Sequence, residues 1–175
     1  MKKSFKQELR HIKCFVFDVD GVMTDGSLYL DTNGELVRKM SVRDGYALKQ
    51  ALKTGYEVCV ITGGTNESVR TRLRDLGIHA IYLGVHQKLE VLKEYLETHQ
   101  IEASSALYMG DDLPDLEAML HCHLATCPTD AAAEIRMKAD YVSPIKGGEG
   151  CVRDIIEQVL KVNGDWNVDP STTSA

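Results

Sequence analysis

Long hydrophobic runs are absent from this sequence, and no apolar stretch approaches the roughly 18 residues that a membrane-spanning helix needs. Residues 1–13 are charged, and they lack the apolar core and the cleavage site of a secretory signal. Internal repeats are also absent, and the one low-complexity stretch is 167–175, which we expect to be a flexible C-terminal tail. We therefore expect neither a membrane protein nor a secreted one.

A surplus of positive charge is lacking as well. Lysine and arginine together number 20, against 26 aspartate and glutamate residues, so the formal net charge is −6. Because binding to duplex nucleic acid or to an anionic membrane requires many phosphates to be neutralised, we expect neither as a partner. The five cysteines are an odd number, and Cys14 and Cys59 lie inside apolar segments. Such thiols are typical of reduced core residues, which favours a cytoplasmic location.

The composition is typical of a globular protein, and we place a single domain at 1–166. The chain has 175 residues, of which 43% are hydrophobic and 26% charged. Short apolar segments alternate with segments of helical periodicity, which predicts an α/β fold with a doubly wound, mostly parallel, Rossmann-like sheet. The predicted strands are 12–17, 57–61, 80–83, 106–109, 123–126 and 140–142, and the predicted helices are 44–53, 67–76, 88–99, 114–120, 130–138 and 152–162.

One segment, 27–40, interrupts this alternation and is predicted to be a β-hairpin. Its halves, 27–31 and 35–40, flank the sequence Thr32-Asn33-Gly34, in which Asn-Gly supplies the positive φ angles of a tight turn. The hairpin follows the first strand, so we expect it to project from the carboxyl edge of the sheet. Because an isolated two-stranded ribbon is marginally stable in water, its apolar side chains need a partner, and we expect a homo-oligomer.

The residues that follow the predicted strands are rich in carboxylates. Ligands bind at the carboxyl ends of the strands in such a sheet, where side chains from several strands meet. Crowded carboxylates repel one another, and an Mg²⁺ ion, which prefers oxygen ligands, relieves that repulsion. With a lysine and a threonine beside them, such groups are suited to bind a phosphoryl group and to attack it, forming an aspartyl phosphate. The residues concerned are Asp18, Asp20, Thr62, Lys88, Asp111, Asp112 and, one turn later, Asp115.

Two other classes of protein share part of this pattern. A non-hydrolytic signalling receiver domain is also doubly wound and accepts a phosphoryl group on an aspartate near threonine and lysine, but it has no second aspartate pair after the lysine. A scaffold protein without activity has no need of the whole set. The cluster His121-Cys122-His123 with Cys127 matches no common zinc spacing, so we interpret it as packing.

These motifs resemble those of a known family. Asp18-Val19-Asp20-Gly21-Val22-Met23-Thr24, Thr62-Gly63, Lys88 and Gly110-Asp111-Asp112 are similar to the four motifs of the haloacid dehalogenase superfamily of phosphatases, over about 12–162. The segments Asp25-Gly26, Ser41-Val42-Arg43-Asp44-Gly45 and 147–153 resemble one subgroup of it, the 3-deoxy-D-manno-octulosonate 8-phosphate (KDO 8-phosphate) phosphatases.

The resemblance implies a haloacid dehalogenase-type fold in which a small hairpin stands in place of a cap domain. It also implies a Mg²⁺-dependent phosphoric monoester hydrolase that acts on a small phosphorylated sugar acid, KDO 8-phosphate, in lipopolysaccharide precursor biosynthesis. The reaction in that subgroup passes through an aspartyl phosphate, and its members are tetramers, so the expected homo-oligomer becomes a tetramer.

The resemblance also implies a role for each matching residue. Asp18 is the expected nucleophile, and Asp20 is the expected general acid and then general base. Thr62 and Lys88 are expected to hold the phosphoryl oxygens. The implied metal ligands are Asp18, Asp20 through its backbone carbonyl, and Asp111, with Asp112 and Asp115 in support. The implied substrate contacts are Asp20, Ser41, Val42, Arg43, Asp44, Gly45, Gly63, Arg72 and Lys88.

The sequence departs from the subgroup at one position. The subgroup commonly has an arginine directly after Thr-Gly, where this chain has Gly64. A relative that acts on nine-carbon sugar acid phosphates has a glutamate there. A phosphatase of a nine-carbon sugar acid 9-phosphate, of the neuraminate or deaminoneuraminate type, is therefore the alternative. Arg43 and Arg70 are two candidates to replace the missing arginine, and the sequence does not decide between them.

Overall fold

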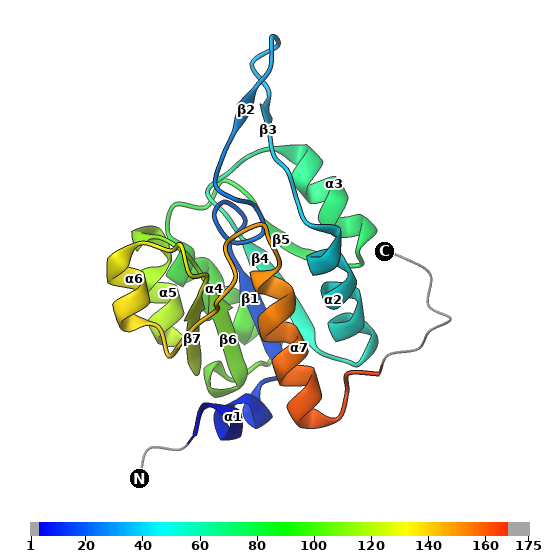
Figure 1. The fold of residues 1–175 in the computed structure, drawn as a ribbon, viewed down its shortest axis with the longest axis vertical. Helices are drawn as coiled ribbons and strands as arrows, with labels where there is room; N and C mark the ends of the chain where they lie inside the picture. The colour runs from blue at the N-terminus through cyan, green and yellow to red at the C-terminus, as the bar shows by residue number, and fades with distance from the viewer. Residues whose placement is uncertain (1–3, 168–175) are drawn as a thin grey trace.

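The computed structural model describes residues 4–167, and at its centre lies a six-stranded sheet (Figure 1). The strand order is β5-β4-β1-β6-β7-β8, and every pairing between neighbours is parallel. The predicted doubly wound, mostly parallel sheet is thus confirmed, and each predicted strand is present. The strands are β1 Cys14–Phe17, β4 Glu57–Ile61, β5 Ala80–Tyr82, β6 Ala106–Met109, β7 Leu124–Cys127 and β8 Tyr141–Val142.

Helices cover both faces of the sheet, which is why its central strands are apolar throughout (Figure 1). Phe15 and Phe17 of β1 belong to one core cluster, into which α2, α3 and α7 pack. Cys14 and Val16, which alternate with them, belong to the cluster under α4, α5 and α6. The helices are α1 Phe5–Glu8, α2 Val42–Lys53, α3 Glu67–Asp75, α4 Lys88–Thr98, α5 Leu116–His121, α6 Ala133–Lys138 and α7 Cys151–Asn163. Short 3₁₀ helices are η1 Leu9–His11, η2 Ala103–Ser105 and η3 Leu113–Asp115.

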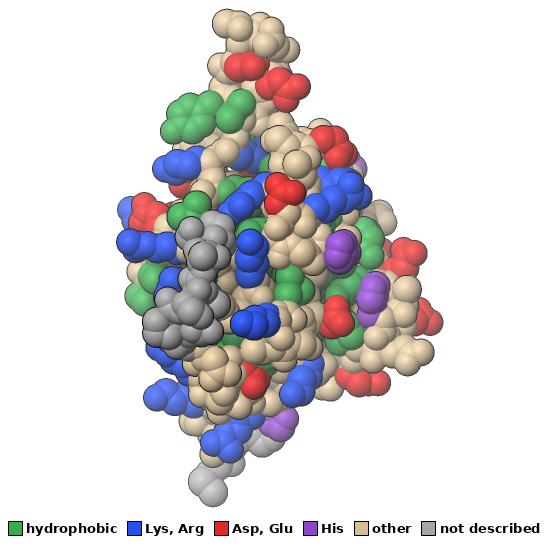
Figure 2. Space-filling model, turned by 90° about the vertical axis from the view of Figure 1, so that its right-hand side faces the viewer, with side chains coloured by type: hydrophobic (Ala, Val, Ile, Leu, Met, Phe, Trp, Pro, Cys, Tyr) green, Lys and Arg blue, Asp and Glu red, His purple; other side chains and the backbone are tan. Residues whose placement is uncertain are grey.

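The predicted hairpin is present and projects far from the body of the molecule (Figure 1). Its strands, β2 Tyr29–Leu30 and β3 Leu36–Val37, are antiparallel and are shorter than the sequence predicted. Within the described residues their side chains stay largely uncovered, from 40% exposed at Leu36 to 76% exposed at Leu30. Figure 2 shows hydrophobic side chains on this projection, at the top of the view. The expected need for an external partner therefore stands.

The remaining expectations about the fold concern cysteines, membrane segments and the tail. All five cysteines are free and buried, and Cys122 and Cys127 lie in the apolar cluster under α4, which supports packing rather than a zinc site. Among the described residues, no helix is both long enough and apolar enough to span a membrane. The tail predicted at 167–175 lies, from residue 168 onward, outside the described residues.

Candidate active site

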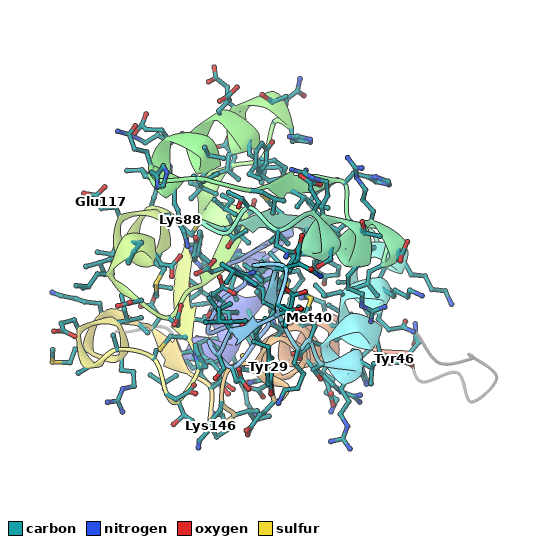
Figure 3. The ribbon with its side chains drawn as sticks, turned by 90° about the horizontal axis from the view of Figure 1, so that it is seen from above. Tyr29, Met40, Tyr46, Lys88, Glu117 and Lys146 are labelled. Atoms are coloured by element: carbon teal, nitrogen blue, oxygen red, sulfur yellow. The ribbon has the colours of Figure 1, made fainter. Side chains whose placement is uncertain are left out.

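The register of the central strands brings the predicted site residues together. Phe17 at the end of β1 pairs with Val60 of β4 on one side and with Met109 of β6 on the other. The residues that follow these strands therefore meet at one edge, which Figure 3 views from above. A cavity of about 440 Å³ opens there. Its walls include Asp18, Asp20, Thr62, Gly63, Lys88, Asp111, Asp112 and Asp115.

Asp18 lies at the floor of this cavity and is 6% exposed. Its Oδ1 accepts a hydrogen bond of 2.7 Å from the backbone N–H of Val19, and its Oδ2 lies 2.9 Å from Nζ of Lys88. Burial and the nearby charge of Asp115 raise the pKa of the Asp18 carboxyl, whereas Lys88 lowers it. A carboxylate held by a cation and a backbone N–H is oriented for attack on an electrophile placed in the cavity.

Lys88, labelled in Figure 3, is the first residue of α4. Its ammonium group bridges two carboxylates. Nζ lies 2.7 Å from Oδ1 of Asp115 as well as 2.9 Å from Asp18. The lysine is 5% exposed. These two carboxylates raise the pKa of Lys88 against the opposing effect of burial, which is the largest single influence. The ammonium therefore stays charged and is available to an anion in the cavity.

Asp115 holds this arrangement in place from below. It is 1% exposed, and its Oδ1 accepts hydrogen bonds from Lys88 and, at 2.9 Å, from the hydroxyl of Tyr108. Its Oδ2 accepts from the backbone N–H groups of Asp111 at 3.1 Å and Asp112 at 3.4 Å. With both oxygens occupied by donors, Asp115 positions Lys88 and the loop after β6. Each oxygen of Asp115 accepts two hydrogen bonds, whereas each oxygen of Asp18 has a single donor, so Asp115 is the poorer metal ligand of the two.

Two carboxylates remain for a cation, and they fit Mg²⁺. Single oxygens of Asp18, Asp111 and Asp115 lie within 4.8 Å of one another. Burial, followed by the charges of Asp18, Asp115 and Asp112, raises the pKa of Asp111 to about 7. Lys88 opposes this repulsion but does not cancel it, so a further cation is favoured here. Oxygen ligands with room for water are what Mg²⁺ prefers, so the donor set of Asp18 and Asp111 suits the expected ion.

The loop that carries Asp20 approaches Asp111 very closely. Gly21 has a φ of +85°, and a Cβ at this position would lie 2.0 Å from Oδ2 of Asp111. Only glycine meets both requirements without displacing the carboxylate. The loop is also supported from behind, because Gly148 donates a hydrogen bond of 2.9 Å from its backbone N–H to the carbonyl oxygen of Val22.

Thr62 directly follows β4 and is 2% exposed. Its hydroxyl oxygen accepts a hydrogen bond of 3.2 Å from the backbone N–H of Gly64. Because that bond uses a lone pair of the oxygen, the hydroxyl proton is free to be donated into the cavity. This is the geometry required to hold a phosphoryl oxygen.

Asp20 is paired with a residue that the sequence analysis missed. Oδ1 and Oδ2 of Asp20 accept hydrogen bonds of 2.6 and 2.9 Å from Nε and Nη2 of Arg38, which follows β3 in the hairpin. The bond with Asp20 is the main cause that raises the pKa of Arg38. The one signal in the sequence was a pair of cations, Arg38-Lys39, where the hairpin returns to the edge that carries the carboxylates.

Arg38 also occupies the space beside Gly64, for which Arg43 and Arg70 were the candidates. A Cβ at Gly64 would lie 3.0 Å from Nη2 of Arg38. Arg70 instead donates to the carbonyl oxygen of Ile81 at 3.0 Å, and Arg43 borders a separate cavity beside α7. Of these three arginines, the one whose guanidinium lies beside Gly64 is therefore Arg38, from the hairpin.

Within residues 4–167, the walls of the cavity that contains Asp18 do not include Ser41, Val42, Arg43, Asp44, Gly45 or Arg72. Ser41 caps α2, and Asp44, which is 3% exposed, accepts a hydrogen bond of 2.8 Å from the backbone N–H of Arg153. Burial raises the pKa of Asp44 to about 6. A Cβ at Gly45 would lie 2.8 Å from Nη2 of Arg72, so this arginine packs against α2. In a single chain these residues join α2 to its neighbours.

A parallel α/β sheet whose carboxyl edge combines a buried aspartate, a lysine, a threonine and an acidic pair defines a hydrolase of the haloacid dehalogenase type. Residues 31–127 match the family model described as haloacid dehalogenase-like hydrolase, and the chain belongs to this family. The resemblance drawn from the motifs is thereby confirmed, and the protein is an enzyme. Membership of a hydrolase family argues against both alternatives, the non-hydrolytic receiver domain and the scaffold without activity.

Individual relatives carry a more specific name. The chain is 33% identical to the 3-deoxy-D-manno-octulosonate 8-phosphate phosphatase of Haemophilus influenzae, over 93% of this chain and 91% of that one. It is 38% identical to the enzyme of the same name from Escherichia coli K12, over 88% and 82%. A solved structure of the Moraxella catarrhalis phosphatase, in complex with magnesium ion, phosphate ion and KDO, matches with a TM-score of 0.87 and 34% identity, over 90% of each chain. The expected magnesium is supported by that relative and by the carboxylates of the cavity.

Proposed function

We propose that this protein is a Mg²⁺-dependent phosphatase that hydrolyses KDO 8-phosphate to KDO and phosphate, a step of lipopolysaccharide precursor biosynthesis. The observation that carries the proposal is the buried Asp18 carboxylate, held 2.9 Å from the ammonium of Lys88 in a cavity that Thr62 and Asp111 also line. Relatives named as phosphatases of this substrate cover nearly the whole chain. The geometry supports phosphoryl transfer, and the relatives support the sugar acid.

In the first step, Asp18 attacks the phosphorus atom and the sugar oxygen leaves. An aspartyl phosphate forms on Asp18, and Asp20, two residues further along the loop, donates a proton to the leaving oxygen. Lys88 and the hydroxyl of Thr62 hold the phosphoryl oxygens and offset the charge that develops on them.

In the second step, a water molecule attacks the same phosphorus atom. Asp20 accepts the proton of the water, the bond to Asp18 breaks, and phosphate leaves. Asp18, Asp111 and the backbone carbonyl of Asp20 are the groups we assign to Mg²⁺, with Asp112 in support. When bound, Mg²⁺ would supply positive charge that offsets the repulsion between the anionic nucleophile and the phosphoryl group. Asp115 keeps Lys88 in place during both steps.

The activity is tested with p-nitrophenyl phosphate and with the sugar acid phosphate in the presence of Mg²⁺. We expect EDTA to abolish turnover and Mg²⁺ to restore it. Ca²⁺ should not restore it, because its longer bonds and higher coordination number would misplace Asp18. The variant Asp18→Asn keeps the size of the side chain but loses the anionic oxygen, so its turnover should fall to the background. Robust turnover by this variant would assign the nucleophile to another residue.

The substrate is tested by comparing kcat/KM across eight-carbon and nine-carbon sugar acid phosphates. A preference for KDO 8-phosphate supports the proposal, whereas a preference for a nine-carbon 9-phosphate supports the alternative that Gly64 raises. The cavity of one chain does not include the implied contacts at 41–45 and Arg72, so their role in binding the sugar acid stays a prediction of the resemblance.

We also propose that the enzyme is a homo-oligomer, a tetramer, assembled through the hairpin. Leu28, Tyr29, Leu30, Leu36 and Val37 are between 40% and 76% exposed on an element that projects from the body. Packing hairpins against other copies of the chain would bury these side chains and close the edges of the ribbon. Light scattering tests this directly, since a fully active particle of 19.4 kDa would contradict it.

A further inference from the structure

The side chain of Arg38 is largely shielded from solvent and makes three hydrogen bonds, which is unusual for an arginine on a projecting hairpin. Its side chain is 6% exposed, against 64% for the side chain of the adjacent Lys39. Nε and Nη2 donate in parallel to the two oxygens of Asp20, at 2.6 and 2.9 Å, and Nη1 donates to the carbonyl oxygen of Leu36 at 2.9 Å. A two-point contact of this kind fixes the plane of the carboxylate as well as its position.

The second strand of the hairpin is itself tied to the body of the protein, which supports the arginine that follows it. The carbonyl oxygen of Leu36 also accepts a hydrogen bond of 3.2 Å from the side chain of Asn66, the N-cap residue of α3. Gly64 leaves the space that the guanidinium fills, because a Cβ there would lie 3.0 Å from Nη2. Arg38 borders the hollow next to the catalytic cavity, and it therefore reaches Asp20 without lining the cavity itself.

We infer that Arg38 is a positioning residue for the step in which water cleaves the aspartyl phosphate. In that step the water oxygen bonds to phosphorus, the bond from phosphorus to the Asp18 oxygen breaks with its electron pair, and the proton of the water passes to Asp20. Two parallel N–H donors on Asp20 hold the carboxylate in a fixed orientation toward that water. The inference deepens the proposed function and rests on the assignment of Asp20 as the base.

The experiment uses p-nitrophenyl phosphate, because p-nitrophenolate leaves without a proton and the first step then does not need Asp20. For Arg38→Met, we expect kcat and KM to fall together by at least about tenfold, with kcat/KM within about twofold of the wild type. Rapid mixing should show a burst of about one p-nitrophenolate per active site, because the aspartyl phosphate accumulates. Arg38→Lys keeps one of the two contacts and should lie between these values.

Lys39→Met is the matched control. Lys39 is the next residue of the same hairpin and also pairs with an aspartate, Asp25, at 3.3 Å, but this aspartate does not border the cavity. We expect its kinetics to equal those of the wild type. A change of the same size in both methionine variants would show that charge on the hairpin, rather than the contact with Asp20, is responsible, and it would overturn the inference.

Two further outcomes separate this inference from the proposed function. Asp20→Asn should show the same burst with a lower kcat, and if it does not, the assignment of Asp20 as the base fails. If Asp20→Asn shows the burst but Arg38→Met keeps the wild-type kcat, or loses kcat/KM without a burst, only the role of Arg38 is overturned. Should Arg38→Met fail to fold, Arg38→Lys decides, since an unchanged kcat in that variant together with no burst contradicts a two-point contact.

Discussion

The stability of the metal-free enzyme should fall as the pH rises from about 4 to about 7. Burial and three neighbouring carboxylates raise the pKa of Asp111 from 3.8 to about 7. Above pH 3.8 the carboxyl ionises in the unfolded chain but keeps its proton in the folded one. Unfolding therefore releases a proton over this window, and the free energy of unfolding decreases with pH until the folded group also ionises near pH 7.

The size of the effect follows from the shift. A difference of 7 − 3.8, about 3 pKa units, corresponds to about 4 kcal/mol at 1.36 kcal/mol per unit. Water reaches the partly exposed carboxylate and screens its neighbours, so we expect about 2 kcal/mol in practice. Asp44, whose pKa burial raises to about 6, adds a contribution of the same sign.

Urea unfolding in EDTA at pH 5 and at pH 8 measures this difference, and Asp111→Asn isolates the share of one residue. The variant should lose about 2 kcal/mol of the pH dependence, because its amide does not ionise. Asp112→Asn removes one of the three carboxylates that raise the pKa of Asp111, so it should reduce the pH dependence by less than Asp111→Asn does. Mg²⁺ should stabilise the wild type more at pH 8 than at pH 5, since protons compete with the ion. Equal pH dependence in the wild type and in Asp111→Asn would refute the reasoning.

Three further changes test other parts of the site. Asp115→Asn places an amide donor against Lys88 or against the backbone N–H groups of Asp111 and Asp112. Urea unfolding should show a free energy of unfolding lower by about 2–3 kcal/mol, and steady-state kinetics should show kcat/KM for p-nitrophenyl phosphate lower by at least about tenfold. Arg72→Ala should lower kcat/KM for the sugar acid phosphate by about 2 kcal/mol and spare p-nitrophenyl phosphate, while equal losses would mark a structural arginine. Leu28→Lys with Leu30→Lys should dissociate the oligomer in light scattering, and an unchanged particle mass would exclude the hairpin interface.

The sheet was predictable because its signals are local and agree with one another. Each apolar run of four to six residues became a strand, since burial on both faces requires a continuous apolar segment. The edge that carries the carboxylates followed from the parallel order, because Asp18 and Thr62 come directly after a strand and Asp111 comes one residue later, after Gly110. The hairpin strands were predicted too long, since sequence alternation at 27–31 and 35–40 does not reveal that, within residues 4–167, the apolar side chains of β2 and β3 stay at least 40% exposed.

Tyr108 shows where a local pattern is insufficient. In the sequence it is one apolar-looking position in the strand Ala106–Met109, yet its hydroxyl donates to Asp115 at 2.9 Å. A tyrosine in the middle of a fully buried strand needs a hydrogen-bond partner, and that requirement indicates a buried polar group nearby. The identity of the group depends on the turn after β6, which brings Asp115 back under its own strand.

Arg38 could not be assigned from the sequence for a different reason. It is 18 residues from Asp20 in the sequence, and the contact forms only if the hairpin returns in the right direction. The turn at Asn33-Gly34 and the hydrogen bond from Asn66 to Leu36 set that direction together. In the sequence, Gly64 suggested a missing substrate contact, since the resembling subgroup commonly has an arginine at that position. In the folded chain the absence of that side chain makes room for a guanidinium from another element. A glycine beside an acidic cavity therefore indicates a close approach from elsewhere in the chain as readily as it indicates a missing contact.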